Sequence, residues 1–266
     1  MKRSILRSPS LAGACLFGML MLALSGNAVP RDTGDGDGDE ADPPALVPGY
    51  LDLRIAPRIT GNAAAGREKS EACTACHGDD GIALVPSFPN LAGQHADFTY
   101  WQLVELKRGR HPSPMTPLVA TLDDQDMRDM AVYYASLPVH PPAAATGSTA
   151  VDEAAEVDVA LLERGHGIYL HGDAAKGIPP CQGCHGNDAR GMPGADVANR
   201  NGYTPYASFP VLRGQQADYL QSKLTEYRNG DLHDSTGDFI MSGVGKRLDD
   251  DSIQAVSAWL SSLHQD

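Results

Sequence analysis

The sequence has 266 residues, a length that allows one large domain or two small ones. Its formal net charge is −13, and the part that follows the basic residues Lys2, Arg3 and Arg7 is more acidic still. Because nucleic-acid phosphates attract Lys and Arg, such an acidic chain is not expected to bind DNA or RNA.

The first 28 residues have the pattern of a secretory signal peptide. A basic start is followed by the apolar run LAGACLFGMLMLAL (11–24) and by small residues before position 29. The run is shorter than the roughly 20 apolar residues of a membrane-spanning helix. We therefore expect export and cleavage near Ala28, with an uncleaved N-terminal anchor as the alternative. Cleavage would also remove Cys15 and leave four cysteines.

Two polar segments divide the rest of the chain. Residues 29–60 contain the stretch TGDGDGDEADPP, whose low hydrophobicity and high charge predict a disordered acidic tether. Residues 141–158 have a similar composition and predict a linker. The two denser regions are called module 1 (61–140) and module 2 (159–266) below.

The two modules are copies of each other. Residues 87–109 align without gaps on 208–230, with 11 of 23 positions identical, and a second block aligns 115–138 on 241–264. Module 2 carries thirteen additional residues before the first block and five more before Met241. This pattern indicates a tandem duplication, since two copies are too few for a solenoid.

Each module is predicted to consist of short helices. Asp123 and Asp249 stand where helix N-caps are expected. No alternating strand pattern is present, so the predicted fold class is all-α. With so few helices each module has a thin core, and another group should fill its centre. The apolar residues after the caps recur at intervals of three, four and three: Met127, Met130, Tyr134 and Leu137 in module 1, and Ile253, Val256, Leu260 and Leu263 in module 2.

Each module carries the pattern C-x-x-C-H, the attachment pattern of a c-type haem. One helical turn presents two thiols to the two vinyl groups of a porphyrin, and the adjacent histidine faces the iron. A zinc half-site would need further ligands nearby, and a thiol redox pair would need a βαβ context. The sequence therefore predicts two covalently bound haem c groups, held by Cys73, Cys76 and His77 in module 1 and by Cys181, Cys184 and His185 in module 2.

A sixth iron ligand is expected in each module. The candidates in module 1 are Met115, Met127, Met130, His95 and His111. Met127 and Met130 lie on the apolar helical stripe, where packing is the expected role. Met115 stands in the proline-bracketed loop HPSPMTP and aligns with Met241, so these two methionines are the predicted ligands. His111 and its counterpart His233 are the alternatives. Histidine–methionine ligation would raise the reduction potential relative to bis-histidine ligation and leave no open position for a substrate.

The repeated stretch SFP-x-L offers a partner for each proximal histidine. The carbonyl groups of Pro89 and Pro210 are placed to accept a hydrogen bond from the imidazole N–H and so to fix the ring. A simple turn is the alternative role of these prolines.

The motifs that carry a family resemblance are CTACHGDDG, VPSFPNLAGQ and PMTPLVATLDDQDM in module 1 and GIPPCQGCHGNDARG in module 2. Their combination resembles the dihaem c4-type cytochromes of bacteria. The resemblance covers about 61–138 and 162–264. It implies two tandem class I cytochrome c domains, each wrapped round a covalent haem, and a periplasmic location. It assigns His77 and Met115 to one iron and His185 and Met241 to the other. The acidic tether, the longer linker and the stretch NRNGYTPYAS (199–208) depart from the family pattern.

The expected function is electron transfer between respiratory complexes, not catalysis. The carrier would take electrons from a quinol-oxidising complex or a periplasmic dehydrogenase and pass them to a terminal oxidase. Its partners would be redox proteins, with membrane contact only through them or through an uncleaved N-terminus. The alternatives are a cytochrome subunit dedicated to one periplasmic dehydrogenase and, less favoured, a dihaem peroxidase-type enzyme, which would need an iron with an open position.

Overall fold

A computed structural model of the protein describes residues 49–111, 113–139 and 158–263. The predicted signal peptide, residues 29–48 of the predicted tether and residues 141–157 of the predicted linker lie outside these ranges. Both modules belong to one compact unit, Leu46–Asp266, so the module boundaries stay a prediction.

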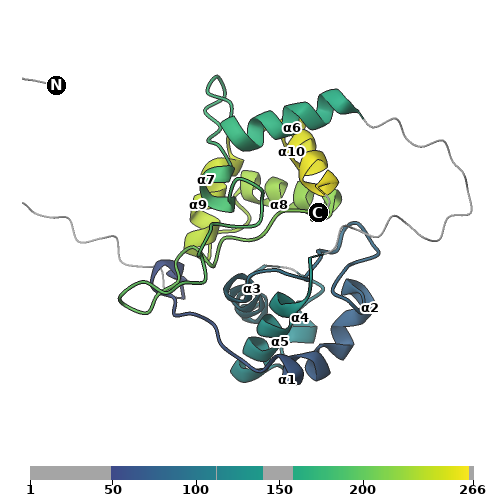
Figure 1. Cartoon of the computed structure of the whole chain (residues 1–266), viewed down its shortest axis with the longest axis vertical. Helices are drawn as coiled ribbons and strands as arrows, with labels where there is room; N and C mark the ends of the chain where they lie inside the picture. The colour runs from purple at the N-terminus through teal and green to yellow at the C-terminus, as the bar shows by residue number, and fades with distance from the viewer. Residues whose placement is uncertain (1–48, 112, 140–157, 264–266) are drawn as a thin grey trace, which may run out of the picture. The chain divides into compact units, whose positions relative to one another are not determined.

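The described residues form short helices joined by loops (Figure 1). No β-strand occurs within them, and three isolated bridges are the nearest equivalent. The expectation of an all-α chain is therefore confirmed. In module 1 and the segment before it, the elements are η1 (Leu53–Ile55), α1 (Ala63–Lys69), η2 (Ser70–Cys73), α2 (Thr74–His77), α3 (Ala96–Arg108), α4 (Thr116–Val119) and α5 (Asp124–Ser136). Module 2 contains α6 (Val159–His171), α7 (Gln182–His185), α8 (Ala217–Asn229), α9 (Thr236–Gly245) and α10 (Asp250–Ser262).

The last helix of each module begins at the expected N-cap. The side chain of Asp123 accepts a hydrogen bond from the N–H of Asp126, which returns one to Asp123 in a capping box. The side chain of Asp249 accepts from the N–H of Ser252 in the same way. These bonds satisfy N–H groups that the first turn of a helix leaves without partners.

The apolar stripes face inward over most of their length. The last residue of each stripe, Leu137 and Leu263, is the C-cap of its helix and is half-buried. The other six residues are buried: Met127, Met130, Tyr134, Ile253, Val256 and Leu260.

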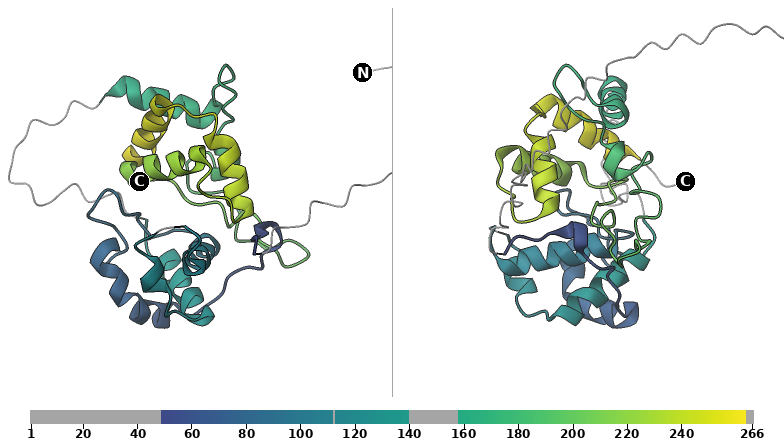
Figure 2. Two further views of the ribbon diagram at one scale, coloured as in Figure 1. Left: turned by 180° about the vertical axis from the view of Figure 1, so that it is seen from behind. Right: turned by 90° about the vertical axis from the view of Figure 1, so that its left-hand side faces the viewer.

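In each module the first helix packs against the last, α1 against α5 and α6 against α10 (Figures 1 and 2). A glycine lies at each contact. A Cβ atom built on Gly66 would lie 2.0 Å from the carbonyl oxygen of Asp129, and one built on Gly165 would lie 2.1 Å from that of Ala255. The absence of a side chain thus allows the two backbones to approach.

Residues 49–60, called the strap below, are ordered in the structure and not disordered as predicted for the tether. Thr236 N donates to Leu51 O at 3.0 Å, which fastens one end of the strap to module 2. Ile59 at the other end is 4% exposed and belongs to the core of module 1. The prediction was wrong here because the strap, unlike the Gly/Asp-rich stretch before it, has apolar residues that the modules bury: Leu51, Leu53, Ala56 and Ile59.

The stretch 199–208, which departs from the family pattern, packs against this strap. Thr204 N donates to Ala56 O at 3.1 Å. The Thr204 hydroxyl donates to Asp97 Oδ1 in module 1 at 2.6 Å. This additional stretch of module 2 therefore joins the strap and module 1 through buried polar contacts.

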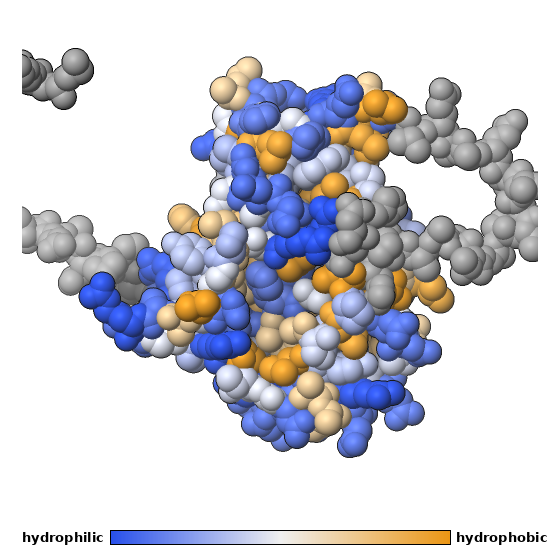
Figure 3. All heavy atoms as spheres, viewed as in Figure 1, coloured by the Kyte–Doolittle hydropathy of each residue, from blue (hydrophilic) through white to orange (hydrophobic). Residues whose placement is uncertain are grey.

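On the face shown in Figure 3, hydrophilic residues predominate and apolar residues lie in separate groups. Large apolar side chains that are mostly exposed include Leu84 and Phe239. Scattered residues of this kind are ordinary on protein surfaces and need no partner to explain them. Among the residues that the structure describes, no helix has both the length and the apolar character to cross a bilayer.

Candidate haem-binding sites

Each C-x-x-C-H motif forms a single helical turn, α2 in module 1 and α7 in module 2. The first cysteine of each motif is the N-cap, and the histidine is the last helical residue. The following glycines, Gly78 and Gly186, have φ values of 76° and 79°. A Cβ on Gly78 would lie 2.0 Å from Ile82 O, and one on Gly186 would lie 2.1 Å from Gly191 O. Glycine is therefore required directly after each motif, where the chain turns back on itself.

Both proximal histidines are buried and oriented in the same way. His77 is 5% exposed and its Nδ1 lies 2.9 Å from Pro89 O. His185 is 6% exposed and its Nδ1 lies 3.0 Å from Pro210 O. A carbonyl oxygen only accepts, so Nδ1 carries the hydrogen and Nε2 keeps its lone pair for a metal. The expected role of the two prolines is confirmed.

The electrostatics of the sites favour ligation by neutral imidazole. Burial lowers the pKa of both His77 and His185 below the ordinary value for histidine. A neutral ring is the form that binds iron. The ring of Phe88 lies 6.2 Å from that of His77, and Phe209 repeats this contact at 6.4 Å from His185.

The cysteines do not have the properties of a thiol redox pair or a disulfide. All four are free and half-buried. Burial raises the pKa of Cys73 above its ordinary value and that of Cys181 to about 11, whereas a reactive thiol has a lowered pKa. Across the described ranges, no group of three or more His, Cys, Asp or Glu residues is arranged to hold a metal ion.

The two predicted methionine ligands occupy different local structures. Met115 is the N-cap of α4, so the loop expected around it ends at that residue. The side chain of Met115 packs against the core of module 1. Met241 lies inside α9, which begins at Thr236. The five residues directly before Met241 are therefore helical, whereas Met115 in module 1 has no helical turn directly before it. Ligation of iron by Met115 and Met241 stays a prediction.

The alternative axial histidines have other partners. The rings of His111 and His233 lie 5.4 Å apart in a T-shaped arrangement, so residues from the two modules face each other. His111 Nε2 also lies 3.0 Å from Asp234 Oδ2. His95 Nδ1 lies 3.0 Å from Phe209 O. His111 Nε2 makes no hydrogen bond despite its short distance from Asp234, so the choice between methionine and histidine as sixth ligand stays a prediction.

Module 1 contains buried donors that fit a haem. Trp101 Nε1 on α3 and Thr116 Oγ1 at the start of α4 are buried and have no hydrogen-bond partner. Buried polar atoms in proteins almost always have one. The propionate groups of a haem are acceptors of the required kind, and Thr116 adjoins the predicted ligand Met115. The residues present therefore fit the group that the motif predicts.

Comparison with known proteins agrees with this chemistry. The family model for cytochrome c matches residues 63–138 and 171–264. Cytochrome c4 of Thiocapsa roseopersicina is 37% identical over 211 residues, which cover 79% of this chain and 96% of that protein. The crystal structure of reduced recombinant cytochrome c4 from Pseudomonas stutzeri superposes with a TM-score of 0.61 at 32% identity, covering 77% of this chain and 100% of that one. The chain belongs to the dihaem cytochrome c4 family.

As a cytochrome c4, the protein has two tandem cytochrome c domains and binds two haem c groups covalently, one in each module. It is an electron carrier and not an enzyme. Another relative, the thiosulfate dehydrogenase electron acceptor of Stutzerimonas stutzeri (strain A1501), is 33% identical over 73% of this chain and 80% of that protein.

The chain's residues prepare each site of the cytochrome c4 for electron exchange. Each bound haem would supply one-electron redox chemistry at its iron. Pro89 O and Pro210 O accept from Nδ1 and fix the imidazole rings, so that Nε2 of each ring would be the atom that binds a haem iron. Burial of these rings keeps water from the proximal side. The sequence had predicted these parts, but it did not single out Gln94 or Gln215, which the tertiary structure brings to the peptide groups that contact His185 and His77.

Proposed function

We propose that this cytochrome c4 acts in the periplasm, to which the N-terminal signal peptide directs it. There it accepts electrons from a membrane quinol-oxidising complex or a periplasmic dehydrogenase and passes them to a terminal oxidase. One observation carries the proposal: two buried histidines lie in the same compact unit, and each binds a proline carbonyl through Nδ1, which leaves Nε2 as the nitrogen with a lone pair. With Met115 and Met241 as the second protein ligands, both irons would be closed to substrates and would only exchange electrons.

The weak near-infrared sulfur-to-iron band of the oxidised holoprotein tests this arrangement. We expect two equivalents of the band per molecule. Met115→Ala and Met241→Ala should each remove one equivalent. The matched control is Met127→Leu, which alters a methionine that is 5% exposed in the core and should keep both. A single equivalent in the unaltered protein would indicate an open or bis-histidine haem, and peroxide turnover would then be measured.

A second candidate is a dedicated electron acceptor for one dehydrogenase. The similarity to the thiosulfate dehydrogenase electron acceptor supports it. Stopped-flow mixing of the oxidised holoprotein with a thiosulfate dehydrogenase plus thiosulfate, and separately with a quinol-oxidising complex plus quinol, distinguishes the two. Fast reduction by the dehydrogenase alone would favour the dedicated acceptor. Reduction by the quinol-oxidising complex would favour the general carrier.

A further inference from the structure

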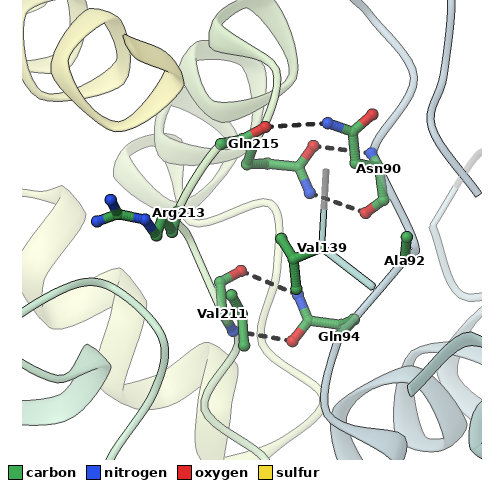
Figure 4. Close-up of a pocket in the computed structure, with 8 residues that line it drawn as sticks. Asn90, Ala92, Gln94, Val139, Val211, Arg213 and Gln215 are labelled. Carbon is green, nitrogen blue, oxygen red and sulfur yellow. Dashed lines mark hydrogen bonds between the residues drawn. The ribbon is translucent and has the colours of Figure 1, made fainter. Parts of the chain in front are cut away.

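Two buried glutamines connect the modules through the same pair of bonds (Figure 4). Gln215 Oε1 accepts from Asn90 N at 2.8 Å, and its Nε2 donates to Asn90 O at 3.0 Å. Gln94 Oε1 accepts from Val211 N at 2.8 Å, and its Nε2 donates to Val211 O at 2.9 Å. Each side-chain amide thus binds both backbone groups of one residue in the other module.

The arrangement is reciprocal. The alignment of 87–109 on 208–230 places Gln94 on Gln215 and Asn90 on Val211. All four residues are between 6% and 8% exposed. Each glutamine oxygen also accepts the N–H of the next residue, at 2.9 Å in both cases. Three hydrogen bonds therefore hold each amide in place, and water does not compete with them.

These bonds end on the peptide groups that hold the proximal histidines. The N–H of Asn90 and the carbonyl of Pro89 belong to one planar peptide unit, whose oxygen accepts from His77 Nδ1. The N–H of Val211 and the carbonyl of Pro210 form the corresponding unit, which His185 contacts. A continuous chain therefore runs from each histidine, through one peptide group, to the glutamine of the other module.

We propose that Gln215 is a positioning residue for His77 and that Gln94 is one for His185, so that each module sets the strength of the histidine–iron bond in the other. Hydrogen bonds in such a chain polarise one another, and an N–H that donates makes its own carbonyl a better acceptor. A stronger bond from Nδ1–H makes the imidazole a more basic ligand, which stabilises ferric iron. This inference rests on the proposed function, in which Nε2 of each ring binds a haem iron.

The test replaces one glutamine at a time in the holoprotein and measures both haem potentials. In Gln215→Met, the haem on His77 should rise in potential while the haem on His185 stays unchanged. Gln94→Met should do the reverse. The shift should change the electron-exchange equilibrium between the haems by up to about tenfold, equal to about 59 mV for one electron. NMR haem-methyl resonances assign each potential to its module.

Gln216→Met is the matched control. Gln216 is also buried at 7% exposure and also crosses between the modules, because its Nε2 donates to Ala83 O at 2.8 Å. Its side chain does not hydrogen-bond to either peptide unit that accepts from a proximal histidine, Pro89–Asn90 or Pro210–Val211. Its replacement should leave both potentials unchanged even if stability falls, which separates positioning from mere structural support.

A second variant keeps the inference testable if the methionine variants do not fold. Gln215→Glu preserves the size of the side chain and the oxygen that accepts from Asn90. When ionised it is a stronger acceptor, so the haem on His77 should fall in potential relative to the haem on His185. Shifts confined to the haem of the altered module, equal shifts in both haems, or no shift would overturn the inference. A missing near-infrared band in the unaltered protein would instead count against the proposed function alone.

Discussion

Glu105 and Glu226 occupy equivalent positions in the two modules but have different partners. Glu226 Oε2 lies 2.7 Å from Lys223 Nζ. The equivalent of Lys223 in module 1 is Gln102, whose Nε2 donates to Glu105 Oε2 at 2.9 Å and brings no positive charge. Burial, together with the nearby carboxylate of Asp238, raises the pKa of Glu105 to about 7. Burial is the main cause of this raised pKa, and no lysine corresponding to Lys223 is present at position 102 to oppose it.

This difference predicts a pH-dependent stability. The pKa of Glu105 is higher in the folded protein than its ordinary value of 4.5, so the folded state holds the proton more firmly. The resulting stabilisation is complete below about pH 4.5 and is lost as the pH rises through about 7. Asp238 and Asp234 face the same group and oppose its ionisation. Glu105→Gln should therefore stabilise the holoprotein at pH 8 by roughly 1–3 kcal/mol and much less at pH 5.

Thermal unfolding followed by circular dichroism at the two pH values measures this effect. Glu226→Gln is the control, because it removes a partly exposed ion pair with Lys223 that is worth about 0–1 kcal/mol. It should give no gain at pH 8. An equal change for Glu105→Gln at both pH values would contradict the assigned titration.

At the scale of the helices, close backbone contact decides where the first and last helices of a module cross. Gly165 on α6 is buried against α10, and a Cβ there would meet both Ala255 O and the side chain of Trp259. Gly167, two residues further along α6 and on a different face of the helix, has no atom within 4 Å of a built Cβ. A side chain at position 165 would therefore clash with α10, whereas a side chain at position 167 would meet no other atom.

Gly165→Ala should destabilise the holoprotein by about 1–3 kcal/mol or more, because α6 must move away from α10 to admit a methyl group. Gly167→Ala should stabilise it by up to about 1 kcal/mol, since alanine favours the helix. Chemical denaturation monitored by far-ultraviolet circular dichroism gives both values. Similar effects of the two substitutions would show that the helix contact is looser than the structure indicates.

At the scale of the whole molecule, the strap and the stretch 199–208 connect the modules through Asp97. This carboxylate is 5% exposed, accepts from Thr204 Oγ1 at 2.6 Å and accepts from Ile59 N in the strap at 3.3 Å. Burial raises its pKa above the ordinary value. The equivalent residue of module 2, Asp218, is exposed, so the buried role belongs to module 1 alone.

Thr204→Val should cost about 1–3 kcal/mol, because it leaves a buried carboxylate oxygen without its donor while preserving the shape of the side chain. Asp218→Asn is the control on the exposed counterpart and should change the free energy of unfolding by less than about 0.5 kcal/mol. Urea unfolding of the holoprotein measures both. A Thr204→Val variant as stable as the control would show that this contact does not help to join the modules.

Several features could be predicted because they depend on residues within one or two helical turns. The C-x-x-C-H turns and the N-caps at Asp123 and Asp249 follow from neighbours close in sequence. The carbonyl groups of Pro89 and Pro210 lie 12 and 25 residues from their histidines, and their role was predicted from the repeated stretch SFP-x-L. The duplication itself was visible as repeated letters. These local patterns were enough to predict an all-α protein with two covalent haems.

The tertiary structure alone decided which distant residues meet. Gln94 and Val211 are 117 residues apart, and no local pattern marks their contact. Three other features depend in the same way on residues from both modules. They are the ordered conformation of the strap, the contact between the rings of His111 and His233, and the raised pKa of Glu105. The sequence by itself determined the chemistry of each module, since that chemistry is built from near neighbours. The coupling between the modules was decided by packing, because burial is what makes a few polar contacts strong and selects their partners.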